Sequence, residues 1–145
     1  MRTYQLYIID DEFASHYFGR EHMFFRLFKE YEEAHGELQS IIRKQIQYIT
    51  KSIPSIRFHQ SIQQQLQNHN GFSMEQGLYI LDQGRGSSAR LEIFDRYFLL
   101  ESQGNYEAET SFFEVLRKNE RSILAIDLKN NHYGWLKPIK ERKFV

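Results

Sequence analysis

Residues 77–100 read GLYILDQGRGSSARLEIFDRYFLL, and this stretch decides the fold class. Three short runs rich in aliphatic and aromatic residues, at 77–81, 89–94 and 96–100, predict three strands. The segment GRGSS at 84–88 and Asp95 supply the small and polar residues of the intervening turns. Strands joined by such short turns pair antiparallel, so this part of the chain predicts an antiparallel sheet.

Working outward from this stretch, the hydrophobic spacing predicts helices on both sides. Upstream lie a strand at 4–9, a helix at 12–18, a helix from about 23 that ends near Gly36, and helices at 37–52 and 55–67. Downstream lie a helix at 107–118 and strands at 123–128 and 132–136. Helices in one block and strands mostly in another are typical of an α+β fold. We therefore expect a single α+β domain over residues 1–145, with a largely antiparallel sheet of five or six strands packed against helices.

The same spacing predicts which side chains form the core. For the helix at 37–52 the expected buried stripe is Leu38, Ile42, Ile46, Ile49 and Ile53. For the helix at 55–67 the expected apolar face is Ile56, His59, Ile62 and Leu66.

Composition excludes several classes of protein. The chain has 145 residues, 41% hydrophobic and 15% aromatic, which is too apolar for a disordered segment. It contains no cysteine, so disulfides, thiolate nucleophiles and cysteine-based zinc sites are excluded. No apolar run approaches the roughly 20 residues that span a bilayer. We expect a cytoplasmic protein that is not bound to a membrane.

Charge is balanced overall but unevenly distributed. Lysine and arginine number 19, as do aspartate and glutamate. Residues 1–40 carry eight acids against four bases, whereas residues 41–73 carry four bases and no acid. The division fits either solvated faces of different sign or a partner surface that needs a defined charge.

No motif in the chain demands an enzyme, a metal or a cofactor. The six histidines lack the spacing of a metalloprotease motif, and the segment GRGSS at 84–88 lacks the lysine of a phosphate-binding loop. Glu107 and Glu109 are two apart on a predicted helix and do not face each other. Asp127 ends an apolar strand, which fits a strand-end aspartate better than a catalytic one. We therefore predict a protein that is not an enzyme.

Aromatic residues near the N-terminus are more informative. Phe13 and Tyr17 are four residues apart and lie one above the other on a helix. If the helix continued through Gly19, both rings would join the core face of the following helix. If Gly19 breaks the helix, Ala14 and Phe18 can supply the buried face and leave the two rings available to a partner.

A second candidate lies on the helix at 37–52. Gln45 and Tyr48 follow a line beside the predicted buried stripe, at the edge of the core or beyond it. An exposed tyrosine and glutamine close to Phe13 and Tyr17 would form a docking patch with an aromatic centre and a polar rim.

Four segments carry a resemblance to a known family. They are EFASHYFGRE at 12–21, KQIQYIT at 44–50, GNYEAETSFFEVLRK at 104–118 and YGWLKPIKERKFV at 133–145. Together they resemble the sporulation inhibitor of replication (SirA) family of endospore-forming bacilli, over essentially the whole chain. Residues 55–103 resemble the family least, and nothing functional is carried over to them.

The resemblance implies a non-enzymatic inhibitor of chromosome replication initiation during sporulation. Such proteins bind the N-terminal domain of the replication initiator DnaA. The family's contact residues match Phe13, Tyr17, Gln45 and Tyr48, which favours a helix break at Gly19. We expect a monomer that binds one partner domain, without a cofactor and without direct contact to nucleic acid.

The alternative is a protein that binds origin DNA through its basic C-terminal tail. That tail contains Lys137, Lys140, Arg142 and Lys143, with one acid among them. Four bases are few beside the six to ten phosphate contacts of a typical DNA-binding protein, roughly counted.

Overall fold

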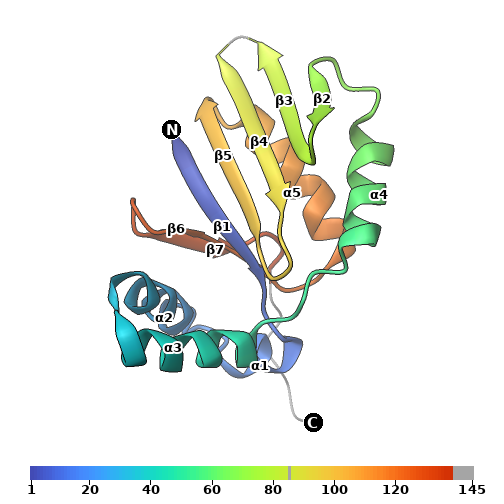
Figure 1. The fold of residues 1–145 in the computed structure, drawn as a ribbon. Coiled ribbons are helices and arrows are strands. Elements are labelled where there is room, and N and C mark those ends of the chain that lie inside the picture. The colour runs from blue at the N-terminus through green and yellow to red at the C-terminus, as the bar shows by residue number, and fades with distance from the viewer. Residues whose placement is uncertain (85, 139–145) are drawn as a thin grey trace.

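The fold is built on one antiparallel sheet, seen in a computed structural model that describes residues 1–84 and 86–138 (Figure 1). Its seven described strands are β1 (Arg2–Ile8), β2 (Phe72–Glu75), β3 (Leu78–Gly84), β4 (Ser87–Ile93), β5 (Phe98–Gly104), β6 (Ile123–Asp127) and β7 (His132–Trp135). They lie in the order β2-β3-β4-β5-β1-β6-β7, and every neighbouring pair is antiparallel. The predicted α+β class and antiparallel sheet are therefore confirmed.

Five helices in the described residues accompany the sheet. They are α1 (Asp11–His16), α2 (His22–Glu33), α3 (Gly36–Ile49), α4 (Ser55–Leu66) and α5 (Glu107–Asn119). In Figure 1, α4 and α5 lie together beside the yellow and green strands, whereas α1, α2 and α3 gather at the other end, below the β6–β7 hairpin. The arrangement separates the helices into two groups.

The two helix groups enclose two separate hydrophobic clusters. One contains α4 and α5 residues with side chains from β1, β3, β4, β5 and β6. The other contains Phe24, Phe28, Ile42 and Ile46 of α2 and α3, packed with residues of β6. Strand β6 serves both, because successive side chains of a strand point to opposite faces and all five of its residues are buried.

The sheet has one strand more than the upper expectation. The additional strand, β2, pairs Glu75 with Leu78 of β3, so that only Gln76 and Gly77 form the turn. Both turn residues have positive φ, 51° and 80°, as a tight two-residue hairpin requires. Glutamine is an uncommon residue in that turn position, so the turn residues did not predict a hairpin. Because β2 is mostly exposed, its hydrophobic pattern did not predict a strand either.

Three burial predictions are wrong. Leu38 is 58% exposed and Ile56 is 75% exposed, although both were expected in the core. The predicted burial of Ile62 and Leu66 on α4 is confirmed, and His59 is half-buried. Phe58, rather than Ile56, completes the buried stripe at four-residue intervals. Phe18, expected to help bury α1, is 42% exposed because α1 ends before it.

The remaining predicted core residues of α3 are confirmed, with small changes of boundary. Ile42, Ile46 and Ile53 are buried, and Ile49 is half-buried. The helix ends at Ile49 rather than at residue 52. No helix of the described residues is long and apolar enough to cross a membrane. The predicted DNA-contacting residues Lys140, Arg142 and Lys143 lie outside the described residues.

Candidate functional site

A short backbone junction brings the start of α1 beside the end of α3. Ile9 and Thr50 form an isolated antiparallel bridge. The N–H of Asp10 donates to the Ile49 carbonyl, and the N–H of Lys51 donates to the Ile8 carbonyl, both at 2.8 Å. Segments about 40 residues apart in sequence are thereby joined at a fixed register.

Helix α1 is short because a capping residue starts it at one end and a glycine turn follows it at the other. Asp10 is the N-cap, and its carboxylate accepts a hydrogen bond from the Glu12 N–H at 3.0 Å. The helix ends at His16, and Gly19 has a φ of 80°, which a residue with a side chain rarely adopts. The predicted break at Gly19 is therefore confirmed, and Tyr17 sits at the C-cap instead of inside a continuous helix.

The turn after α1 is held by Glu21. Its carboxylate accepts hydrogen bonds from the Gly19 N–H at 3.1 Å and from the Trp135 ring nitrogen at 3.3 Å. Burial acts to raise the pKa of Glu21, but hydrogen bonds from the backbone N–H groups of Glu21 and Gly19 and from Trp135 hold it below the ordinary value. The charged carboxylate thus ties the turn to β7.

The four residues expected to bind a partner lie close together. The rings of Phe13 and Tyr48 meet edge to face with centroids 5.4 Å apart. Tyr17 makes the same kind of contact with Phe24, also at 5.4 Å. Phe13 and Tyr17 are half-buried against the second cluster, Gln45 is exposed, and Tyr48 is 76% exposed. The rings of Phe13 and Tyr17 are therefore neither fully buried in the core nor fully exposed.

Three of these four residues line a groove of about 670 Å³. Its lining residues are Tyr17, Met23, Phe24, Leu27, Lys44, Gln45, Tyr48 and Ile49. Most of this lining is apolar, and Lys44 and Gln45 supply the polar groups. We call this groove, together with Phe13 at its edge, the α1–α3 groove. Such a surface suits a partner with an apolar projection and a few polar atoms.

Several groove residues were not predicted as site residues. Met23 and Leu27 lie four residues apart on α2; Met23 is 43% exposed and both line the groove. Arg20 places its guanidinium 5.0 Å from the centroid of the Tyr17 ring. The four-residue spacing of Met23 and Leu27 marks a shared face but does not say whether that face is covered.

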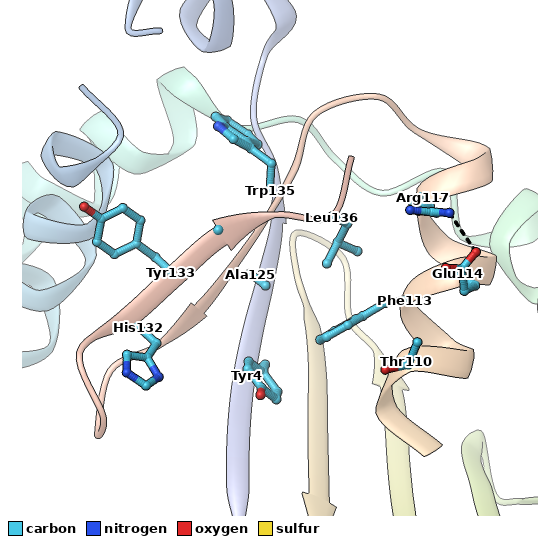
Figure 2. A pocket seen from close by; sticks show the side chains of 11 residues that line it. Tyr4, Thr110, Phe113, Glu114, Arg117, Ala125, His132, Tyr133, Trp135 and Leu136 are labelled. Carbon is cyan, nitrogen blue, oxygen red and sulfur yellow. Dashed lines mark ion pairs between the residues drawn. The ribbon is translucent and has the colours of Figure 1, made fainter. Parts of the chain in front are cut away.

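A second hollow of about 390 Å³ lies between β1, α5 and the β6–β7 hairpin (Figure 2). Tyr4, Phe113 and Leu136 point toward one another around it, over Ala125. Its rim carries one ion pair, with an Arg117 Nη atom 2.9 Å from a Glu114 carboxylate oxygen. Burial raises the pKa of Tyr4, so its hydroxyl stays protonated and is a poor base. Among the described residues that line the hollow, Glu114 is the only one with a carboxylate.

The carboxylates of Glu109 and Asp127 both accept hydrogen bonds from neighbouring residues. Glu109 accepts hydrogen bonds from the Arg2 side chain at 2.6 Å and from the Ser102 hydroxyl at 2.8 Å. Asp127 accepts from the N–H and side-chain amide of Asn130, which closes the turn between β6 and β7. Within residues 1–84 and 86–138, no three His, Asp or Glu side chains converge as a metal-ligand group.

Comparison with known proteins places the chain in a family. The family model described as "Sporulation inhibitor of replication protein SirA" matches residues 2–140. The chain belongs to the SirA family. A relative from Bacillus subtilis (strain 168), named sporulation inhibitor of replication protein SirA, is 42% identical over 148 aligned positions. The alignment covers 99% of this chain and 99% of the relative, so the SirA resemblance expected from four segments extends over the whole fold.

Proposed function

We propose that this SirA-family protein is a non-enzymatic inhibitor of replication initiation in sporulating cells. It acts by binding the N-terminal domain of the initiator DnaA through the α1–α3 groove. Phe13, Tyr17, Gln45 and Tyr48 are the contact residues. The observation that carries the proposal is the joining of these four residues, from two distant segments, around one largely apolar groove.

The physical chemistry of the groove supports a protein partner. Tyr48 combines a large apolar ring with a hydroxyl and is 76% exposed, a combination typical of interface anchors. Its ring rests against Phe13, a contact that reduces the side-chain freedom to be lost on binding. An interface of roughly 1,200–1,600 Å² in total is sufficient for specific association.

Inhibition by this route needs only occupancy. A protein seated on the N-terminal domain of the initiator denies that surface to other proteins and keeps initiators from assembling at the origin. No bond is made or broken, so neither a cofactor nor a nucleotide is required. The expected location is the cytoplasm, where the initiator and the chromosome are found.

The test is a calorimetric titration of the full chain with DnaA and with its isolated N-terminal domain. Tyr48→Ala should weaken binding by about 30-fold or more, the equivalent of roughly 2 kcal/mol for an interface anchor. Tyr106→Ala is the matched control, since Tyr106 is also exposed, at 64%, and lies outside the groove. Equal affinity of the Tyr48→Ala and Tyr106→Ala variants would contradict the proposal.

Phe13→Ala and Tyr17→Ala extend the test to the half-buried rings. Each should weaken binding and also lower stability modestly, because each ring packs against the second cluster. The DNA-binding alternative predicts a different result. In that case the chain would bind origin DNA without DnaA, with an affinity that falls steeply as salt rises.

A further inference from the structure

The end of α3 lacks the usual chemistry of a helix C-terminus. The last carbonyls of a helix have no partner within the helix, and a glycine with positive φ or a basic residue in the last turn commonly satisfies them. Here the C-cap is Thr50, in an extended conformation, and the last turn contains no basic residue. The docking residues Gln45 and Tyr48 lie in these final turns.

Besides the Asp10 N–H on the Ile49 carbonyl, Arg96 brings a cation and hydrogen-bond donors to the end of α3 from a distant part of the chain. One Nη group donates to the Gln47 carbonyl at 2.8 Å, the Thr50 carbonyl at 2.9 Å and the Thr50 hydroxyl at 3.1 Å. The other Nη group donates to the Ser52 hydroxyl at 3.0 Å. A cation at the C-terminus of a helix also interacts favourably with the helix dipole.

Only the two Nη groups of the Arg96 guanidinium contact α3 and the residues just after it. Its Nε is buried and has no hydrogen-bond partner among the described residues. Arg96 therefore takes a position that serves the end of α3, although one of its own N–H donors is left without a partner among the described residues. Lysine cannot reproduce this contact, because an ammonium lacks the planar fork that reaches several acceptors at once.

Arg96 is itself held firmly. It lies in the turn between β4 and β5, which is closed by a hydrogen bond from the Phe94 N–H to the Tyr97 carbonyl at 2.9 Å. The Tyr97 ring stacks on Phe94 at 4.8 Å. The neighbouring Asp95 carbonyl accepts from the Ile53 N–H at 2.9 Å, just beyond α3. The β4–β5 turn, closed by its own hydrogen bond, thus contacts both the end of α3 and the residues that follow it.

We propose that Arg96 is a positioning residue for partner binding, which holds the last turn of α3 so that Tyr48 meets the Phe13 ring. This inference rests on the proposed function and adds a residue outside the groove to it. The bridge between Ile9 and Thr50 fixes the start of α1 at the same place. Through Thr50, Arg96 therefore supports the junction that sets the distance between the two halves of the docking surface, and a preorganised surface binds with a smaller loss of entropy.

The test measures affinity for the N-terminal domain of DnaA, using the full chain with Arg96→Ala, Arg96→Lys and Ser52→Ala. Arg90→Ala is the control, since Arg90 lies in β4 and pairs at the surface with Glu101. We expect about a tenfold loss of affinity for Arg96→Ala, a comparable loss for Arg96→Lys, a smaller loss for Ser52→Ala and no change for Arg90→Ala. Amide hydrogen exchange should accelerate at residues 47–51 while the sheet stays protected.

A double-mutant cycle with Tyr48→Ala separates positioning from general destabilisation. If Arg96 acts through Tyr48, removing Arg96 should cost little additional affinity once the Tyr48 ring is absent. Equal costs in the two backgrounds would overturn the proposal, as would wild-type affinity in an Arg96→Ala variant whose α3 amides exchange faster. If Arg96→Ala fails to fold, Ser52→Ala and Arg96→Lys carry the same comparison. A wild-type chain that does not bind DnaA would instead reject the proposed function, and the role of Arg96 in binding with it.

Discussion

The two sides of the sheet are built differently, and under the proposed function the difference separates stability from recognition. Among the described residues, the cluster with α4 and α5 has eighteen buried side chains and five half-buried ones packed against it. The cluster with α1, α2 and α3 has eight buried side chains and ten half-buried ones. A core with few half-buried residues is already complete. A small core edged by half-buried rings has apolar surface left for a partner to cover.

The strongest way to test this comparison is to remove a ring from the α4–α5 side. Phe112 of α5 is completely buried, so Phe112→Ala should lower the free energy of unfolding by about 3–5 kcal/mol. That loss is a large share of the roughly 5–15 kcal/mol typical of a whole domain. Urea unfolding measures it. The folded fraction should still bind DnaA normally, and a specific loss of affinity would show that the two sides are not separate.

A second test compares two apolar residues of α3. Ile42 is 5% exposed and Leu38 is 58% exposed. Ile42→Ala should cost about 2–4 kcal/mol in the free energy of unfolding, whereas Leu38→Ala should cost less than about 0.5 kcal/mol. Thermal or urea unfolding of the two variants gives the answer. Similar costs would mean that Leu38 is covered in solution and that the α1–α3 side is more closed than described.

Glycines with positive φ sharpen the comparison further. A Cβ at Gly104 would collide with the backbone carbonyl of Gly86, whereas a Cβ at Gly36 meets nothing. Both residues have positive φ, 78° and 62°, so alanine is strained at either position. Gly104→Ala should cost more than about 2 kcal/mol, and Gly36→Ala about 1 kcal/mol. A larger loss of stability for Gly36→Ala than for Gly104→Ala would contradict the close backbone contact between Gly104 and Gly86.

The smallest expected effect concerns pH and the turn after α1. The pKa of Glu21 is held below its ordinary value of 4.5 in the folded chain, so the carboxylate contributes stability above that pH and loses it as pH falls further. Wild type and Glu21→Gln should therefore differ in stability at pH 7 and converge toward pH 3. Urea unfolding across this range tests the expectation, with exposed Glu75→Gln as control. A constant difference over the whole range would exclude the charged form of Glu21 as the cause.

The contrast between predicted and observed strands shows what local sequence encodes. The runs at 77–81 and 89–94 predict β3 and β4 well, because aliphatic and aromatic residues favour a half-buried pleated surface. Strand β2 escaped prediction because three of its four residues are exposed, and it is held by pairing with β3 and by the packing of Phe72 on Tyr79. Local preference thus identified the strands that bury most of their side chains, and also the exposed strand β7, whose neighbouring turn residues mark a hairpin.

The candidate site shows the same division. Asp10 as a helix cap is a local feature that the sequence shows, whereas the break at Gly19 was one of two alternatives until the family resemblance favoured it. The contact between Phe13 and Tyr48 is not, since it depends on the bridge between Ile9 and Thr50. The sequence therefore could not show that Tyr48 lies beside Phe13.

The sequence by itself determined the fold class, the family and most helix boundaries. Those properties follow from periodicity, turn chemistry and motif, which act over a few neighbouring residues. Only the tertiary structure decided that Leu38 is exposed, that Met23 lines a groove and that Arg96 holds the end of α3. Burial and long-range hydrogen bonds depend on which segments meet in space, and no local pattern along the chain contains that information.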